Sequence, residues 1–296
     1  MIPYVRQHDI EYGRCDQVSP LIRRVTANNP GPFTYLGTGT YIVGQGEVAV
    51  IDPGPDDPAH LDAILAAVAG ERVTHILITH HHSDHSPLAG PLKARTGATI
   101  YGCAVATPDV DDGGVKMEAG HDLSFQPDVS LCGGGTVIEG AGWTAEAIAT
   151  PGHTSNHICF ALHEENACFT GDHIMGWSTT VITPPDGDMT DYLASLDRIR
   201  ARNFTTLWPT HGPPIRDVDA FIAAYIAHRQ ERVDQILNAL KAGPARIRDL
   251  TPRLYADVDP KLWPAASRSM QAAMIHLVRE GRIAAEGEEG AYRLVR

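Results

Sequence analysis

Short apolar runs separated by glycines and other turn residues dominate the first hundred positions. Between residues 35 and 53 these runs alternate at strand length, a pattern typical of consecutive antiparallel strands with tight turns. Apolar residues then recur at helical spacing over residues 60–69, and the apolar run 73–78 predicts a buried strand. A helix near 87–96 and a strand at 99–102 follow. Because strands and helices alternate, we expect a sheet with helices on its outer faces.

The middle of the chain adds a second strand-rich block. The apolar pattern predicts strands at residues 145–150, 157–162 and 167–171, and helices at 191–199 and 221–240. Residues 107–124 separate the two blocks, and their Asp, Gly and Pro content predicts a surface loop.

The pattern changes again after Leu240. Residues 241–244, which read Lys-Ala-Gly-Pro, break the preceding helix, and shorter helical patterns follow at 247–255 and 262–280. Two apolar runs then flank the turn-rich residues 286–290, which is a hairpin signal. Three helices and a β-hairpin make a winged helix. We therefore expect a large domain at 1–221 and a small α+β winged-helix domain at 222–296.

Composition and charge narrow the class of protein. Hydrophobic residues make up 43% of the 296 positions and charged residues 20%, which is ordinary for a globular protein. The net charge is −12, with about +3 in residues 222–296 and about −15 in residues 1–221. An acidic surface disfavours non-specific binding to a phosphate backbone. Nucleic acid is therefore not favoured as the main partner.

The apolar runs are only as long as strands, so we expect no interaction with a membrane. The first residues lack the apolar core of a secretory signal, which predicts a cytoplasmic protein. The five cysteines have no CxxC spacing and are expected to be free thiols in a reducing compartment. They are Cys15, Cys103, Cys132, Cys159 and Cys168.

The most informative stretch is residues 79–85, which read Thr-His-His-His-Ser-Asp-His directly after the predicted strand 73–78. It offers four metal ligands within six positions: His80, His82, Asp84 and His85. Imidazole nitrogens and a carboxylate suit Zn²⁺, Fe or Mn²⁺. Two ligands at i and i+2 can converge on one ion while the next two face a neighbour, so a two-metal site is the first hypothesis. His81 points away from its neighbours in an extended segment and is expected to be structural.

Three further candidate ligands end a predicted strand and enter a loop. His153 lies in Thr-Pro-Gly-His-Thr, Asp172 in Phe-Thr-Gly-Asp, and His211 in Trp-Pro-Thr-His-Gly. Any one of them could be an ordinary loop residue. Together with the cluster at residues 80–85, they predict one shared site.

The series from Asp52 in Ile-Asp-Pro-Gly, through the cluster at 80–85, to His153, Asp172 and His211 resembles the five signature motifs of the metallo-β-lactamase superfamily in order and spacing. The resemblance covers essentially the whole chain. It implies an α/β fold, the αββα sandwich, in which two mixed sheets pack face to face with helices outside and the strand ends gather at one rim.

The resemblance also implies a role for each ligand. His80, His82 and His153 match ligands of the first metal, Asp84, His85 and His211 match ligands of the second, and Asp172 matches the carboxylate that bridges both. The implied cofactors are two divalent metal ions, with zinc favoured and iron or manganese as alternatives.

Two metals can hold a bridging hydroxide beside a polarised carbonyl or phosphoryl oxygen. Attack by that hydroxide is the predicted mechanism, with Asp84 or a metal-bound water as the acid that protonates the leaving group.

Three residues beside the ligands keep two interpretations each. Asp52 matches a non-ligand acid that supports the histidine loop, but it could also merely open an Asp-Pro-Gly turn. His157 could donate a hydrogen bond to substrate or to Asp172, or could be a packed histidine at a strand start. Trp177 either lines the pocket or belongs to the core.

Flanking sequences point to one branch of the superfamily. Residues 29–34, residues 152–157 and His228-Arg229 resemble hydrolases that carry a C-terminal winged helix, some of which are endoribonucleases and others thioesterases. Where that branch is expected to have Asn in a Gly-Thr-Asn-Thr turn, this chain has Gly39.

The favoured function is hydrolysis of a small ester, thioester or lactone. Cleavage of single-stranded RNA is the alternative, and a nucleic-acid-binding module is the third interpretation. The predicted helix 262–280 offers only Arg268 and Arg279 as basic residues, which disfavours that third interpretation. The winged helix is expected instead to shape the pocket or to form the interface of a homodimer.

Overall fold

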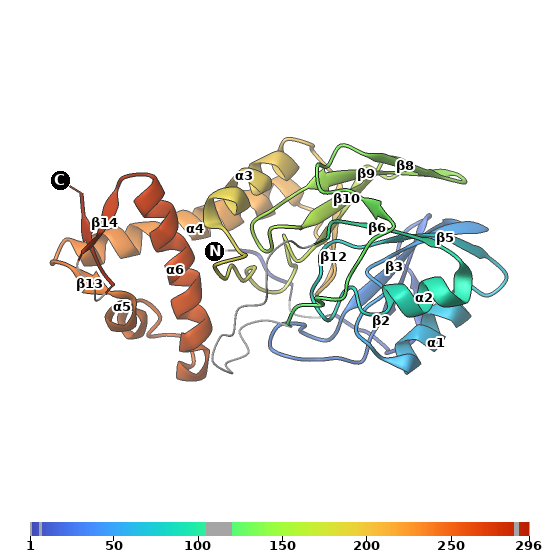
Figure 1. Cartoon of the computed structure of the whole chain (residues 1–296), viewed down its shortest axis with the longest axis horizontal. Coiled ribbons are helices and arrows are strands. Elements are labelled where there is room, and N and C mark those ends of the chain that lie inside the picture. Colours follow the sequence, from blue (N-terminus) through green and yellow to red (C-terminus); the bar gives the residue numbers. More distant parts are fainter. Residues whose placement is uncertain (1, 6–7, 105–119, 287–289, 296) are drawn as a thin grey trace.

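The protein is described by a computed structural model that covers residues 2–5, 8–104, 120–286 and 290–295. Two sheets pack face to face in the large domain (Figure 1). The first has seven strands in sequence order: β1 (Cys15–Gln17), β2 (Ile22–Thr26), β3 (Gly39–Gln45), β4 (Glu47–Ile51), β5 (Arg72–Leu77), β6 (Thr99–Gly102) and β7 (Val129–Ser130). Pairing is antiparallel from β1 to β4 and parallel from β4 to β7. The expected hairpin between residues 35 and 53 is β3–β4.

The second sheet has five strands. In sequence order they are β8 (Val137–Gly140), β9 (Trp143–Ala149), β10 (Ile158–Leu162), β11 (Ala167–Gly171) and β12 (Thr206–Pro209), and in space the order is β12-β11-β10-β9-β8. Within this sheet β11 and β12 pair in parallel, and the other described neighbours pair antiparallel. Predicted ligands lie in the loops that follow β5, β9, β11 and β12. Both sheets therefore contribute residues to the predicted site.

Helices cover the outer faces of both sheets. The first sheet is covered by α1 (Pro58–Ala67) and α2 (Ala89–Thr96), and the second by α3 (Met189–Arg200) and α4 (Val218–Leu240). Asp57 caps the start of α1 by accepting a hydrogen bond from the backbone N–H of Ala59, as expected for an aspartate before a proline at the first helical position. Three apolar layers result, and the middle layer between the sheets includes Tyr41, Phe160 and Phe169. The predicted αββα sandwich is confirmed.

The C-terminal residues form a smaller unit with its own core. It contains α5 (Ile247–Leu254), the short 3₁₀ helix η1 (Pro260–Leu262), α6 (Trp263–Arg279), and a sheet of β13 (Ala245–Arg246), β15 (Ala291–Leu294) and β14 (Ile283–Glu286), in that spatial order. The expected turn at 286–290 includes residues 287–289, which lie outside the described residues. Helices and a hairpin form the expected winged helix.

Helix α4 runs between the two units (Figure 1). Its first half packs into the large domain through Phe221 and Tyr225, while Val233 and Ile236 pack into the core of the winged helix. One continuous helix therefore contributes to both cores.

The expectation of five free thiols is wrong for two of them. Cys103 and Cys132 form a disulfide with their Cα atoms 4.7 Å apart, whereas Cys15, Cys159 and Cys168 are free. The pairing follows from the topology, because β6 and β7 lie side by side with Gly102 opposite Ser130. Sequence spacing gave no hint, since 29 positions separate the two cysteines.

Two further observations bear on the sequence-based expectations. Among the described residues, no helix has the length and apolar character that a membrane crossing requires. Of the predicted surface loop 107–124, residues 107–119 lie outside the described residues. Residues 120–122 instead lie against the histidine loop, where His121 pairs with His82 in a backbone bridge.

Candidate metal centre

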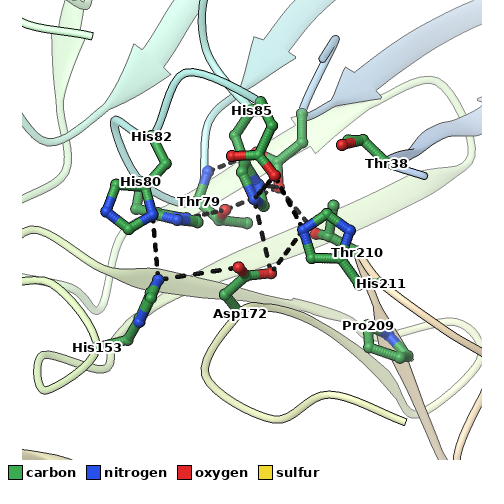
Figure 2. Close-up of polar contacts among 12 residues, drawn as sticks. Thr38, Thr79, His80, His82, His85, His153, Asp172, Pro209, Thr210 and His211 are labelled. Carbon is green, nitrogen blue, oxygen red and sulfur yellow. Dashed lines mark hydrogen bonds and ion pairs between the residues drawn. The ribbon is translucent and has the colours of Figure 1, made fainter. Parts of the chain in front are cut away.

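Seven predicted ligands lie close together in loops at the strand ends. Figure 2 labels six of them: His80, His82, His85, His153, Asp172 and His211. The loop between β5 and α2 supplies four of the seven, and the loops after β9, β11 and β12 supply one each. The seven are His80, His82, Asp84, His85, His153, Asp172 and His211, and all of them are buried. The chain thus brings together every residue that the sequence indicated.

The ligand atoms form two groups. His80, His82, His153 and Asp172 make up the first group, and Asp84, His85 and His211 make up the second. Within each group the candidate atoms lie within 4.8 Å of one another. This division matches the one that the resemblance implied.

Asp172 faces both groups. Its Oδ2 lies 3.8 Å from Nε2 of His153, while its Oδ1 lies 3.6 Å from Nε2 of His85 and 3.4 Å from Nε2 of His211. Asp84 belongs to one side only, with Oδ2 at 3.0 Å from Nε2 of His211 and 3.5 Å from Nε2 of His85. The position of Asp172 is the one that a bridging carboxylate needs.

Hydrogen bonds orient the histidines of both groups. Nδ1 of His153 donates to the carbonyl of Val181 at 2.7 Å, and Nδ1 of His211 donates to the carbonyl of Gly37 at 3.2 Å. A carbonyl only accepts, so in each neutral ring the proton resides on Nδ1 and the lone pair resides on Nε2. Both lone pairs then face the centre of the site.

Asp52 fixes two more rings in the same way. Its Oδ2 accepts a hydrogen bond from Nδ1 of His85 at 2.9 Å and another from the hydroxyl of Thr79 at 2.7 Å. The Thr79 hydroxyl has thereby used its proton, so it accepts from Nδ1 of His80 at 3.0 Å. Nε2 of His80 and of His85 is left as the ligand atom.

Asp52 also holds the loops themselves. Its Oδ1 accepts from the backbone N–H of Thr79 at 2.8 Å, and its Oδ2 accepts from the hydroxyl of Thr210 at 3.1 Å. A single buried carboxylate therefore ties the start of the histidine loop to the loop that carries His211. Of the two interpretations of Asp52, the supporting acid is the one that the contacts favour.

Burial keeps two histidines of the first group, His80 and His82, neutral. Desolvation, followed by the nearby ring of His85, lowers the pKa of His80 well below its ordinary value. Desolvation and the ring of His153 do the same to the pKa of His82. Neutral imidazole is the form that binds a metal.

Carboxylates dominate the second group. Burial by itself lowers the pKa of His85, but the charges of Asp84 and Asp172 outweigh it and raise that pKa well above its ordinary value. For His211, burial is likewise outweighed by Asp172 and Asp84, and the pKa is raised. The two carboxylates therefore favour a positive charge in the second group, which a bound metal ion would supply.

The donor set passes a direct test for a metal. Among the described residues, Nε2 of His80, His85 and His211 and Oδ1 of Asp84 and Asp172 are buried without a hydrogen-bond partner. Buried polar atoms normally have one, and leaving them without a partner costs roughly 1–3 kcal/mol each. Five such atoms, distributed over the two groups of ligands, fit bound divalent ions.

His157 acts on the backbone and not on the Asp172 carboxylate. Its Nε2 accepts a hydrogen bond from the backbone N–H of Asp172 at 3.3 Å, and its Nδ1 donates to the hydroxyl of Thr150 at 2.9 Å. The ring also stacks on His80 at 5.0 Å between centroids. His157 is thus a packed histidine that positions the loop of Asp172.

A narrow opening leads from the site to a larger groove. The opening is lined by Phe33, Trp177, Val181 and four of the predicted ligands, and Trp177 stacks on Tyr35 with ring centroids 4.8 Å apart. The groove has a volume of about 1280 Å³. It shares Phe33, Trp177 and Val181 with the opening and reaches Tyr255, Leu262 and Ala266 of the winged helix. Of the two interpretations of Trp177, the pocket-lining one agrees with this placement.

A comparison with known protein families agrees with the site that these seven residues form. The sequence profile of the metallo-beta-lactamase superfamily matches residues 35–211, which contain all seven predicted ligands. The chain belongs to the metallo-beta-lactamase superfamily. A second profile, that of the beta-lactamase associated winged helix domain, matches residues 247–291. The chain is a hydrolase of this superfamily with the winged helix at its C-terminal end.

Individual members of the superfamily resemble the chain over most of its length. A beta-lactamase-like protein 2 homolog of Caenorhabditis elegans is 32% identical, covering 90% of this chain and 87% of the relative. An atrochrysone carboxyl ACP thioesterase of Claviceps purpurea is 32% identical, covering 82% of this chain and 74% of the relative. The structure of a beta-lactamase domain protein from Burkholderia ambifaria superposes with a TM-score of 0.81 at 20% identity, covering 99% and 97% of the two chains.

The sequence did not reveal some polar residues beside the superfamily site. His121 lies within the predicted loop 107–124, Asp186 precedes α3, and Asn156 lies next to His157. None of them lies in a metal motif, and only the fold brings them to His81. The one signal in the sequence was His121, a histidine within a turn-rich segment.

Proposed function

We propose that this protein hydrolyses an acyl thioester at a centre of two divalent metal ions. His80, His82 and His153 would hold one ion, Asp84, His85 and His211 the other, and Asp172 both. The observation that carries the proposal is the orientation of the rings. Nδ1 of His80, His85, His153 and His211 is bound to an acceptor, so each Nε2 faces the centre. Nitrogen and carboxylate donors suit Zn²⁺, with Fe and Mn²⁺ as alternatives.

Two bound ions would supply a hydroxide at neutral pH and polarise the carbonyl oxygen of the substrate. The chain's own residues supply position and a path for the proton. Asp84 is buried and lies at the mouth of the opening. Its carboxylate accepts a proton from the attacking water and then returns it to the leaving group. Bulky side chains at the mouth, Phe33 and Trp177, limit the access of other water.

The groove favours an extended substrate. Apolar and aromatic side chains line it from both units, including Phe33, Trp177, Tyr255 and Leu262. An acyl chain bound there would remove apolar surface from water, worth about 25 cal/mol per Å². We propose that residues 1–221 carry the reaction and that the winged helix in residues 222–296 forms the far wall of the groove.

Two arguments favour a thioester among carbonyl substrates. Relatives that cover most of this chain are named as thioesterases, which supports the same bond here. A thiol has an ordinary pKa of about 8.5, so its anion leaves more readily than an alkoxide and one carboxylate suffices as the proton carrier.

An activity screen tests the proposal. Zinc-loaded and manganese-loaded protein would be offered acyl thioesters of short and long chain, lactones, and a short single-stranded RNA in parallel. Asp84→Ala serves as the control. The expected result is thioester hydrolysis that the Asp84→Ala variant lacks. Cleavage of RNA without thioester hydrolysis, again lost in the variant, would overturn the proposal.

A further inference from the structure

A second cluster of ligand-type side chains lies beside the proposed centre and shares no residue with it. His81, His121 and Asp186 each offer one ligand atom, and the three atoms lie within 4.8 Å of one another. His81 is buried, while His121 and Asp186 are partly buried. Three separate segments of the chain thus converge on one point, and none of the three residues is among the seven proposed ligands of the centre.

The hydrogen bonds of Asn156 determine which nitrogen of His81 faces this point. The side-chain amide of Asn156 donates to the carbonyl of Cys103 at 2.8 Å, so its oxygen faces the other way. That oxygen accepts from the hydroxyl of Thr154 at 2.9 Å and lies 2.9 Å from Nδ1 of His81. Nδ1 of His81 therefore carries the proton, and Nε2 presents its lone pair to the cluster.

Backbone contacts hold His121 in place. The N–H of Asp122 donates to the carbonyl of His81 at 2.7 Å, and the N–H of Ser83 donates to the carbonyl of Gly120 at 2.9 Å. The hydroxyl of Ser86 donates to the Asp122 carboxylate at 2.8 Å. His121 is consequently clamped against the histidine loop, with its Nδ1 only 2.6 Å from Nε2 of His81.

Asp186 completes the set from the loop before α3. One of its oxygens, Oδ2, accepts from the backbone N–H of Ser155 at 3.2 Å. Two imidazoles and a carboxylate are a familiar set of three protein ligands for zinc that leaves a position for water. The outer hydrogen bond from Asn156 to the first ligand is the support that ligating histidines generally have.

We propose that His81, His121 and Asp186 form a third divalent-cation site, selective for zinc-class ions, that fastens residues 120–122 and the Asp186 loop to the histidine loop. Zinc–nitrogen bonds of about 2.0–2.1 Å at a tetrahedral ion would place the two nitrogens roughly 3.3 Å apart. His81 and His121 therefore separate by less than 1 Å when the ion enters. The partly buried ring of His121 can make that movement.

Metal content and diffraction test this site with Zn²⁺ as the probe. Full-length protein is saturated with Zn²⁺ and then freed of unbound metal. The His121→Gln variant should contain one equivalent of Zn²⁺ per chain less than the wild type. A matched control, His163→Gln, changes a histidine whose side chain is 46% exposed and should leave the content unchanged. An anomalous difference map of wild-type crystals at the zinc edge should show a peak between His81, His121 and Asp186.

Two results would overturn the site. One is a wild-type map without a peak at this position, which would leave a simple hydrogen-bonded pair of histidines. The other is an unchanged zinc content in a folded His121→Gln variant. Because the wild-type map requires no substitution, the test stands even if a variant fails to fold.

Discussion

The guanidinium of Arg24 occupies the space that a side chain at Gly39 would need. A Cβ atom at residue 39 would lie 2.2 Å from Nε of Arg24. Arg24 in turn donates to the carbonyl of Gly212 at 2.9 Å and to the carbonyl of Thr210 at 3.2 Å, on both sides of His211. The glycine that departs from the expected Gly-Thr-Asn-Thr turn is therefore explained by packing: it makes room for an arginine that holds a proposed ligand loop.

Restoring the expected asparagine should destabilise the protein. Gly39→Asn would force Arg24 from its carbonyl partners, and overpacking of this kind costs about 1–3 kcal/mol. Urea denaturation of the metal-free protein measures the loss. Gly133→Asn is the control, because nothing lies within 4 Å of a Cβ at that position. Equal stabilities of the two variants would contradict the packing explanation.

Asp52→Asn should weaken metal binding without touching a proposed ligand. The Asp52 carboxylate accepts four hydrogen bonds, including that of Nδ1 of His85. An amide group offers only one acceptor atom, so at least one of these donors loses its partner. Affinity for Zn²⁺, measured by competition with a chromophoric chelator, is expected to fall roughly 10–100-fold. The control variant Asp56→Asn, at an exposed position, should bind Zn²⁺ with the wild-type affinity. An unchanged affinity in Asp52→Asn would show that Asp52 does not support the metal centre.

A longer side chain in the groove should reduce activity on long-chain substrates more than on short-chain substrates. Ala266→Arg in α6 would fill the part of the groove that the winged helix lines. For long-chain thioesters kcat/KM is expected to fall about 10–200-fold, while short-chain thioesters stay close to the wild-type value. Ala242→Arg, at an exposed position after α4, is the matched control. A parallel loss on both substrates would argue against the groove as the acyl site.

An ion pair between the two units should make stability depend on pH. Asp188 caps α3 and pairs with Arg279 of α6. Burial raises the pKa of the Asp188 carboxyl, but hydrogen bonds from the N–H of Asp191 and from Arg279 outweigh burial, and the pKa is lowered. A lowered folded-state pKa means that this stabilisation is complete above the unfolded pKa of about 3.9 and is lost as pH falls through the folded value.

Asp188→Asn keeps the helix cap and removes the charge. The variant should be less stable than the wild type by about 0.5–1 kcal/mol at pH 7, because the pair is partly exposed. The difference should shrink below about pH 4. Chemical denaturation at several pH values measures it, and a difference that grows on acidification would contradict the sign.

The sequence predicted most of the fold because its apolar periodicity is strong where elements are buried on one face. The strands 99–102 and 167–171 were located to the residue as β6 and β11. All seven proposed ligands could be named from the sequence because they lie in loops that follow four predicted strands. Periodicity could not find β7 or the Cys103–Cys132 disulfide, since a two-residue strand carries no pattern and its pairing is decided by the whole sheet.

The surroundings of the proposed centre were less accessible to prediction. His81 was expected to be structural and not a ligand, and that expectation gave no sign of His121 or Asp186. Those two residues lie 40 and 105 positions farther along the chain in segments without regular structure. Long-range contacts between loops depend on the fold and leave no local pattern.

The most direct test of the two-metal centre is an anomalous difference map at the zinc edge from crystals of the zinc-loaded protein. The account predicts one peak among His80, His82 and His153 and another among Asp84, His85 and His211, with Asp172 within bonding distance of both. A single peak, or two peaks of which Asp172 touches only one, would contradict it.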